Sequence, residues 1–204
     1  MNARGRSAIY RKSGFSFQII SYDIRSCDAW MRLIRGKTDL ISSRRIPVKD
    51  KLHTYHVNVV WTGNDGTGTS SYRSYRRDHE IRAEGKPTIA GSSDPSFRGD
   101  PTRWNPEDLM VASLSACHKL WYLGLCAQAN VIVLSYEDAA EGTMLEENGG
   151  AGQFTSVVLR PRIVIDATSD AKTALELHHK AHEMCFIARS VNFPVTNEPQ
   201  ISVE

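Results

Sequence analysis

The sequence predicts one α+β domain that follows a basic N-terminal extension. Two long helical patterns, at residues 105–129 and 169–188, lie among segments in which apolar and polar residues alternate. Alternation with a period of two is typical of strands that bury one face, and a few helices set among such strands define an α+β fold. The chain of 204 residues is long enough to bury a core, and its four cysteines are too few for a secreted disulfide scaffold.

Residues 1–52 form the extension, with twelve lysines and arginines against four aspartates. The remainder of the chain carries a net negative charge. A basic arm of this kind can bind nucleic acid or an anionic membrane. The commonest structure for it is a poorly ordered tail outside the fold, and we predict that structure, with neither nucleic acid nor membrane as a partner.

A cytoplasmic location is expected. No apolar segment of the signal-peptide type opens the chain, and paired cysteines in a reducing compartment are usually redox-active or metal-binding. The longest apolar stretch, residues 109–129, carries His118 and Lys119 near its middle, which a membrane-spanning helix rarely tolerates.

The domain, residues 53–204, is predicted to begin with three strands. The first covers residues 53–62, and its apolar side chains share one face: Tyr55, Val57, Val59 and Trp61. Turn residues follow at 63–66, and two more strands are predicted over 67–77 and 79–83. Residues 86–103 are predicted to be a loop, because three prolines and two glycines interrupt them.

The start of the first helix is well marked. Asn105 is a good N-cap, and Pro106 fits the first helical position, where its missing N–H costs nothing. Glu107 and Asp108 favour the positive end of the helix dipole. The residues from Leu109 onward are apolar almost all round, so we predict a buried central helix.

The second half of the domain is predicted to be strand, strand, helix, strand. A strand over 131–141 is joined by a hairpin loop at 146–152 to a long strand over 153–167. Pro161 predicts an edge position or a bulge in that long strand. The second helix covers 169–188, with Thr168 or Ser169 as its cap, and residues 198–203 form a last strand.

Cys117 and Cys185 each lie late in a predicted helix, among packing residues. The pattern suits one thiol that attacks and one that resolves. A disulfide requires Cα atoms within about 4.4 to 6.8 Å, so the second helix would have to pack on the first. The alternative is that each is a small buried hydrophobe. Cys27 and Cys126 are predicted to be inert.

A thiol that reduces peroxides must be mostly ionised, which needs about 3.4 kcal/mol of preference for the anion over an ordinary cysteine. Cys117 lies more than three turns past the helix start, beyond the reach of the dipole. His118 points about 100° away round the helix. An arginine is therefore expected to supply the charge. The candidates precede the helix: Arg73, Arg76, Arg77, Arg82, Arg98 and Arg103.

Glu107 is the obvious carboxylate to hold that arginine. Glu107 and Cys117 are ten residues apart, a rise of about 15 Å along one helix. The two side chains cannot meet within one straight helix. If both serve one site, Glu107 comes from a second subunit or from a bent entry turn, which favours a two-fold dimer.

Two other groups of polar residues allow competing interpretations. His178, His182 and Cys185 have helical spacing that metal sites use, but no further ligand pair accompanies them, and an exposed polar helix face is favoured. Tyr72 and Tyr75, with nearby arginines, resemble a nucleic-acid stacking surface, but a solvated strand face is favoured.

At these motifs the chain resembles the OsmC/Ohr family, over roughly residues 53–204. The family pattern is Asn-Pro-Glu followed after ten residues by a reactive cysteine, here Asn105-Pro106-Glu107 and Cys117. A second cysteine in the later helix matches Cys185. The segment from Cys185 to Val195 is similar to the branch called OsmC-like peroxiredoxins.

The resemblance implies antiparallel sheets around a buried central helix, in an intertwined homodimer. It also implies a thiol peroxidase without metal or cofactor, in which Cys117 attacks an organic hydroperoxide and the resulting sulfenic acid condenses with Cys185. A dithiol or lipoylated protein would reduce the disulfide. The family's arginine corresponds best to Arg98, nine residues before Glu107, with Arg77 as second choice. The alternative is a protein of this fold that binds a small hydrophobic ligand with idle thiols.

Overall fold

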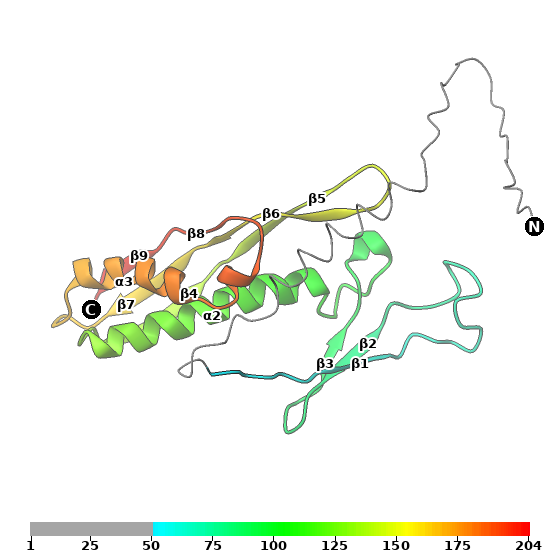
Figure 1. Cartoon of the computed structure of the whole chain (residues 1–204), viewed down its shortest axis with the longest axis horizontal. Helices are drawn as coiled ribbons and strands as arrows, with labels where there is room; N and C mark the ends of the chain where they lie inside the picture. Colours follow the sequence, from blue (N-terminus) through cyan, green and yellow to red (C-terminus); the bar gives the residue numbers. More distant parts are fainter. Residues whose placement is uncertain (1–50) are drawn as a thin grey trace, which may run out of the picture. The chain divides into compact units, whose positions relative to one another are not determined.

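The structure is a computed structural model that describes residues 51–204, within which residues 55–204 form one compact unit. The predictions for residues 1–50 and for Cys27 lie outside the described residues. The unit is an α+β fold with two helices and three small sheets, so the predicted fold class is confirmed. Figure 1 shows the order of the elements along the chain.

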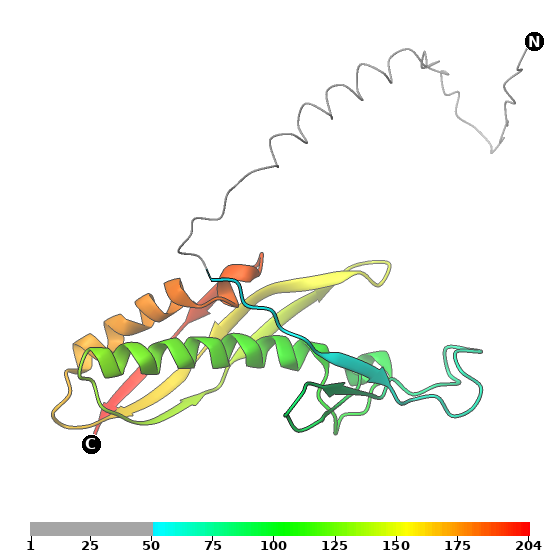
Figure 2. The same ribbon diagram turned by 60° about the horizontal axis from the view of Figure 1, so that its bottom comes forward.

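A small antiparallel sheet in the order β1-β2-β3 opens the unit. It comprises β1 (Asn58–Trp61), β2 (His79–Arg82) and β3 (Ile89–Gly91). β3 and the short 3-10 helix η2 (Pro95–Phe97) lie where the sequence predicted an irregular loop, so that prediction was wrong in part. The sheet lies beyond the start of α2 and pairs with neither of the other sheets (Figures 1 and 2).

The strand predicted over residues 67–77 is absent, and turns take its place. The Ser74 side chain stabilises these turns. Its hydroxyl donates to the carbonyl oxygen of Gly68 at 3.1 Å and accepts from the Ser71 N–H at 3.0 Å. Short hydroxyl side chains that bond to nearby backbone compete with sheet pairing, and the pattern of alternating residues does not reveal this competition.

Helix α2 (Pro106–Gln128) begins as predicted. The Asn105 side chain accepts the backbone N–H of Asp108 at 2.6 Å, and Pro106 occupies the first turn. Within one chain, however, α2 buries a single stripe of side chains, formed by Leu114, His118, Tyr122 and Cys126. By length and composition alone α2 could cross a membrane, a property it shares with the core helices of soluble proteins.

The remaining strands form two separate three-stranded sheets. One has the order β4-β7-β9 and the other the order β5-β6-β8, with antiparallel first pairs and parallel second pairs. The strands are β4 (Val133–Asp138), β5 (Glu141–Glu146), β6 (Gly152–Leu159), β7 (Pro161–Ile165), β8 (Val195–Asn197) and β9 (Gln200–Val203). The single strands predicted over 131–141 and 153–167 are therefore each broken, and β8 was not foreseen.

Arg160 marks the break between β6 and β7. Its backbone N–H donates to Asp138 at 2.7 Å, and its guanidinium binds Glu141 at 2.8 Å and Glu198 at 3.0 Å, one carboxylate from each neighbouring chain segment. Pro161 begins β7, the central strand of its sheet. Of the two predicted settings, an edge or a bulge, the edge was therefore wrong, and the strand is instead interrupted next to Pro161. A first strand position tolerates proline because the missing N–H lies outside the regular pairing.

Helix α3 (Ala171–Met184) is capped by Asp170, whose side chain accepts the Thr173 N–H at 2.8 Å, and not by Thr168 or Ser169. It ends four residues earlier than predicted, which leaves Cys185 as its C-cap. A short 3-10 helix, η3 (Ala188–Ser190), follows.

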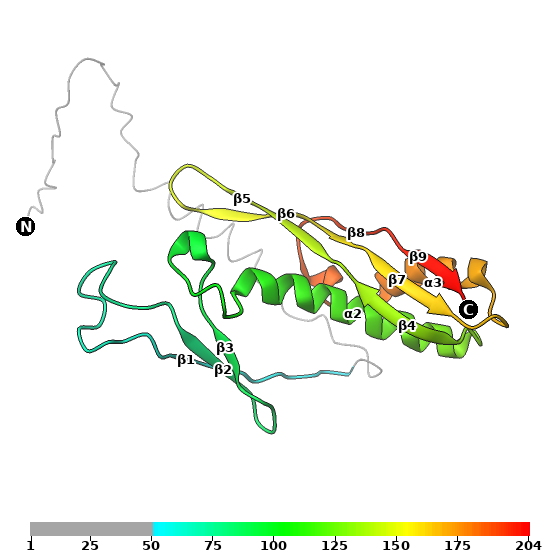
Figure 3. The ribbon, with the colours of Figure 1, turned by 180° about the vertical axis from the view of Figure 1, so that it is seen from behind.

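Both helices pack on one face of the β4 to β9 strands, side by side (Figures 2 and 3). Two clusters of buried side chains result. One joins α2, α3 and β7 around Tyr122 and Ile163, and the other joins α2 to β6 and β8 around Leu114 and Leu159.

The first strand is shorter than the predicted 53–62, because only Asn58–Trp61 form β1. The apolar row at residues 55–61 stays uncovered in one chain. Tyr55 is 85% exposed, and Val57, Val59 and Trp61 are also exposed. Leu120, on the outer face of α2, is exposed as well. Ordered apolar rows of this kind usually mark contact surfaces.

Candidate active site

The packing of α3 on α2 brings the two predicted redox cysteines together. Cys117 is half buried on α2, and Cys185 is 1% exposed at the end of α3. Both are free thiols, near enough for Cys117 to influence the pKa of Cys185. Burial, together with the neighbouring Cys117, raises the pKa of Cys185 to about 11.

The turn after α3 holds Cys185 through its backbone. The Cys185 N–H donates to the carbonyl of His182 at 3.2 Å, and the Arg189 N–H donates to the carbonyl of Cys185 at 3.1 Å. The Ala188 N–H donates to Cys185 Sγ at 3.4 Å. Cys185 is therefore fixed by a tight turn rather than by the helix in which the sequence placed it.

Two buried histidines tie α2 to α3 beside the thiols. His118 Nε2 and His178 Nδ1 lie 3.0 Å apart, and each residue is 1% exposed. The Tyr122 ring stacks on His178 with ring centres 3.8 Å apart. Burial lowers the pKa of His118 to about 4 and that of His178 to about 3. Both rings are thus neutral near pH 7.

The prediction of an exposed polar face was therefore wrong for His178. His118 lies on the same stripe of α2 as Leu114 and Tyr122, four residues from each, and that spacing could have revealed its burial. Within residues 51–204 no group of three or more histidine, cysteine or acidic side chains is arranged to hold a metal ion.

The buried histidines predict acid sensitivity. Their folded-state pKa values lie below the ordinary value of 6.5, so as pH falls below about 6.5 the unfolded chain binds protons that the folded chain excludes. The free energy of unfolding should then fall by up to about 1.4 kcal/mol per pH unit for each histidine, down to about pH 4. Urea unfolding from pH 7.5 to 4.5 measures this.

The exposed neighbour His179 provides the matched control. A His179→Gln variant should keep the full acid sensitivity, whereas His178→Gln should lose about half of the histidine contribution. Equal pH profiles for wild type and His178→Gln would contradict the assignment.

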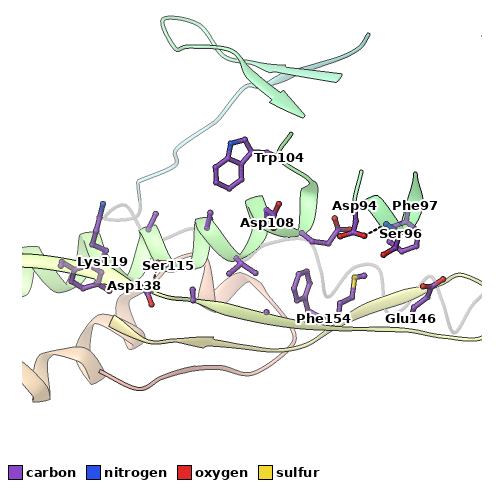
Figure 4. Close-up of a pocket in the computed structure, with 18 residues that line it drawn as sticks. Asp94, Ser96, Phe97, Trp104, Asp108, Ser115, Lys119, Asp138, Glu146 and Phe154 are labelled. Atoms are coloured by element: carbon purple, nitrogen blue, oxygen red, sulfur yellow. Dashed lines mark hydrogen bonds between the residues drawn. The ribbon is translucent and has the colours of Figure 1, made fainter. Parts of the chain in front are cut away.

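Glu107 lies in the first turn of α2, away from Cys117 and in a different environment. It lines a pocket of about 780 Å³ between α2 and strands β4 to β6, with aromatic walls from Phe97, Trp104 and Phe154 (Figure 4). Cys117 does not line this pocket. One carboxylate oxygen of Glu107 is buried and has no hydrogen-bond partner within the described part of one chain.

The other charged groups of the pocket are mostly acidic. Among the described residues, Lys119 is the one cation that lines the pocket, and four further carboxylates line it as well, those of Asp94, Asp108, Asp138 and Glu146. Asp138 accepts a hydrogen bond from the Ser115 hydroxyl at 2.6 Å. The pocket is thus partly apolar and negatively charged, which favours the binding of a cation.

Neither predicted arginine lies beside Cys117 in one chain. Arg98 is exposed, with a left-handed backbone at φ 67°, and its guanidinium carbon lies 5.9 Å from the centre of the Tyr72 ring. Arg77 is held between Tyr72 and Tyr75, 4.3 and 4.2 Å from the ring centres. Its guanidinium also donates to backbone carbonyls of both tyrosines.

The tyrosines therefore serve a local cation–π cluster in a loop, and the predicted strand face does not exist. Between residues 51 and 204, no hydrogen bond or ion pair joins an arginine to Cys117 or Glu107 within one chain.

A buried carboxylate that no sequence pattern indicated lies next to the small sheet. Asp78 is almost fully buried, pairs with Arg76, accepts from the Ser92 hydroxyl at 3.2 Å and lies 3.9 Å from Arg103. It ties the small sheet to the loop before α2. Two of the candidate arginines are therefore engaged in structure.

The fold and the thiols together define a class, α+β proteins with two cysteines where two long helices meet. A family model described as OsmC-like protein matches residues 99–199. A solved OsmC-like protein of unknown function from Vibrio cholerae is 33% identical, with a TM-score of 0.66, covering 73% of this chain and 100% of that one. The chain belongs to the OsmC family of proteins.

More distant structures share the fold. An organic hydroperoxide resistance protein, OsmC, from Legionella pneumophila is 17% identical, with a TM-score of 0.54, covering 75% of this chain and 99% of that one. An organic hydroperoxide resistance protein from Elizabethkingia anophelis is 17% identical, with a TM-score of 0.53, covering 76% of this chain and 100% of that one. A search of curated proteins found no match.

Proposed function

We propose that this protein is a thiol-dependent peroxidase that reduces organic hydroperoxides, with Cys117 as the attacking thiol and Cys185 as the resolving thiol. The observation that carries the proposal is the pair of neighbouring free thiols where α3 meets α2, one half buried and one fully buried. Family membership and the names of the distant structures support the same activity.

The electron balance of the reaction involves these two sulfurs, the hydroperoxide and a reductant. The Cys117 thiolate attacks the terminal peroxide oxygen, the O–O bond breaks, and the alcohol leaves after taking a proton. Cys117 is then a sulfenic acid. The Cys185 sulfur attacks it, a disulfide forms, and water leaves. A dithiol, free or carried on a lipoylated protein, returns both cysteines to thiols.

The site is proposed to be completed by a second copy of the chain. Glu107 is about 15 Å from Cys117 along α2, and its buried oxygen lacks a partner in one chain. The exposed apolar row at residues 55–61 and Leu120 on the outer face of α2 would be buried by contact with another chain. In an intertwined homodimer, Arg98 and Glu107 would serve the cysteines of the other subunit. A fully active monomer in solution would contradict this arrangement.

A turnover assay tests the activity. Purified protein should consume cumene hydroperoxide with dithiothreitol or dihydrolipoamide as reductant, and should do so faster than it consumes hydrogen peroxide. Peroxide consumption no faster than that of the reductant alone would refute the proposal. The assay needs no added metal or cofactor.

Arg98→Ala should slow the oxidation of Cys117. An ordinary thiol is about 3% ionised at pH 7, so loss of the cation that ionises an attacking thiol costs up to about 30-fold in rate. The loss should shrink at pH 9, where ordinary thiols ionise unaided. Stopped-flow measurement of oxidation at both pH values gives the answer.

Arg77→Ala is the matched control, because Arg77 contacts the same tyrosine ring but is held in its own loop. It should retain the rate of wild type to within about threefold. A large loss from Arg77→Ala and none from Arg98→Ala would transfer the activating role to Arg77.

A second candidate function rests on the pocket. Its aromatic walls and a volume of about 780 Å³ suit a small hydrophobic ligand, and Cys117 does not line it. A protein that only binds such a ligand would leave its thiols unchanged by peroxide, so the turnover assay separates the two functions.

A further inference from the structure

The turn after α3 presents a backbone donor to the buried thiol. The Ala188 N–H lies 3.4 Å from Cys185 Sγ, whereas the next N–H along the chain, that of Arg189, bonds to the Cys185 carbonyl. A backbone donor in a tight turn cannot rotate away. Negative charge that develops on this sulfur therefore meets a fixed hydrogen-bond donor.

The two sulfurs of a Cys117–Cys185 disulfide would not be equally open to a third sulfur. An attacking thiolate must touch the sulfur with which it bonds. Cys185 is 1% exposed, covered by the turn that follows it, whereas Cys117 is half buried on α2. Without opening of the turn, only Cys117 can be reached.

The leaving-group preference acts in the opposite direction. Burial raises the pKa of Cys185 to about 11, and a thiol of high pKa is a slow leaving group. The Ala188 N–H works against that cost, because a hydrogen bond to the anion stabilises it. Access decides between the two effects, since a poor leaving group slows a reaction but an unreachable sulfur does not react.

Resting on the proposed function, we propose that the dithiol reductant attacks Cys117, and that Cys185 leaves as a thiolate received by the Ala188 N–H. A bond forms between the reductant sulfur and Cys117 Sγ as the Cys117–Cys185 bond breaks, and the electron pair moves to Cys185 Sγ. The second thiolate of the reductant then displaces Cys117, which leaves as a thiolate, and the reductant departs as its disulfide.

The direction of attack is measured on the full wild-type chain. Diamide first links the two cysteines without peroxide. The protein then meets excess 2-mercaptoethanol, is quenched in acid at millisecond to second times, and is alkylated with N-ethylmaleimide before peptide mapping. The mercaptoethanol adduct should accumulate on Cys117 while Cys185 carries the maleimide.

An adduct on Cys185, or equal adducts on both cysteines, would overturn the proposal. Failure of diamide to link the pair would overturn it as well, by removing its premise. Failure of the proposed function looks different: diamide would link the pair and the adduct would form on Cys117, but cumene hydroperoxide would not oxidise the protein.

A pair of proline variants tests the backbone donor. Ala188→Pro removes the N–H that faces the sulfur, and Arg189→Pro removes a neighbouring N–H that faces a carbonyl. Each fixes φ at the substituted position and removes one backbone N–H. Ala188→Pro should slow the first step of reduction by about tenfold relative to Arg189→Pro. Equal rates in two variants that retain the wild-type circular dichroism would remove Ala188 from the mechanism.

Discussion

Replacing Cys117 by serine should abolish the turnover of organic hydroperoxides, with a loss of at least about 1000-fold in kcat/KM. A serine hydroxyl does not ionise near neutral pH and is not oxidised by peroxide, whereas the thiolate is the nucleophile in thiol peroxidases. The substitution exchanges one sulfur for oxygen on a half-buried face of α2, so the fold should remain intact. Steady-state consumption of cumene hydroperoxide with excess dithiol measures the loss.

Two matched variants sharpen this result. Cys126→Ser changes a buried cysteine on the same helix, away from α3's C-cap, and should keep turnover within a fewfold of wild type. Cys185→Ser should still form a sulfenic acid on Cys117 in a single turnover, which a dimedone adduct detects, but should make no disulfide. Equal losses in Cys117→Ser and Cys126→Ser would mean that the first variant acts through folding.

Heterodimers should reveal that Glu107 and Cys117 of one site come from different subunits. In a purified dimer with Cys117→Ser in one chain and Glu107→Gln in the other, one site keeps both native residues. The activity of this heterodimer should reach about half that of the wild-type dimer, far above the activity of either variant homodimer. The reason is the separation of about 15 Å between the two residues along α2.

The mirror-image heterodimer is the control. It carries both substitutions in one chain and none in the other, so every site that spans the two chains loses one native residue. It should have little activity. If instead this dimer keeps half of the wild-type rate and the first heterodimer is inactive, each site lies within one chain and the composite site is wrong.

The start of α2 and the fold class were predictable because they depend on local chemistry. The Asn105 cap, Pro106 in the first turn and the long apolar run after it all act within a few residues. The strand breaks were not predictable. They depend on Arg160, which binds carboxylates from β5 and from the segment before β9, contacts that exist only after folding.

Some features of the candidate site were likewise predictable from local sequence, and others were not. The spacing of Glu107 and Cys117 is a property of one helix and could be read directly. The buried contact between His118 and His178 joins residues 60 positions apart, so no local pattern announced it. The turn that fixes Cys185 also escaped notice, because the helical pattern continues past Met184 while the helix itself ends there.

The pairing of Cys117 with Cys185 is tested most directly by counting and locating thiols after one equivalent of cumene hydroperoxide per chain. The four cysteines of the chain should yield two free thiols, and peptide mapping should find one link, between Cys117 and Cys185. Four thiols that survive the peroxide, or a link that joins any other pair, would contradict the assignment of this protein as a two-cysteine peroxidase.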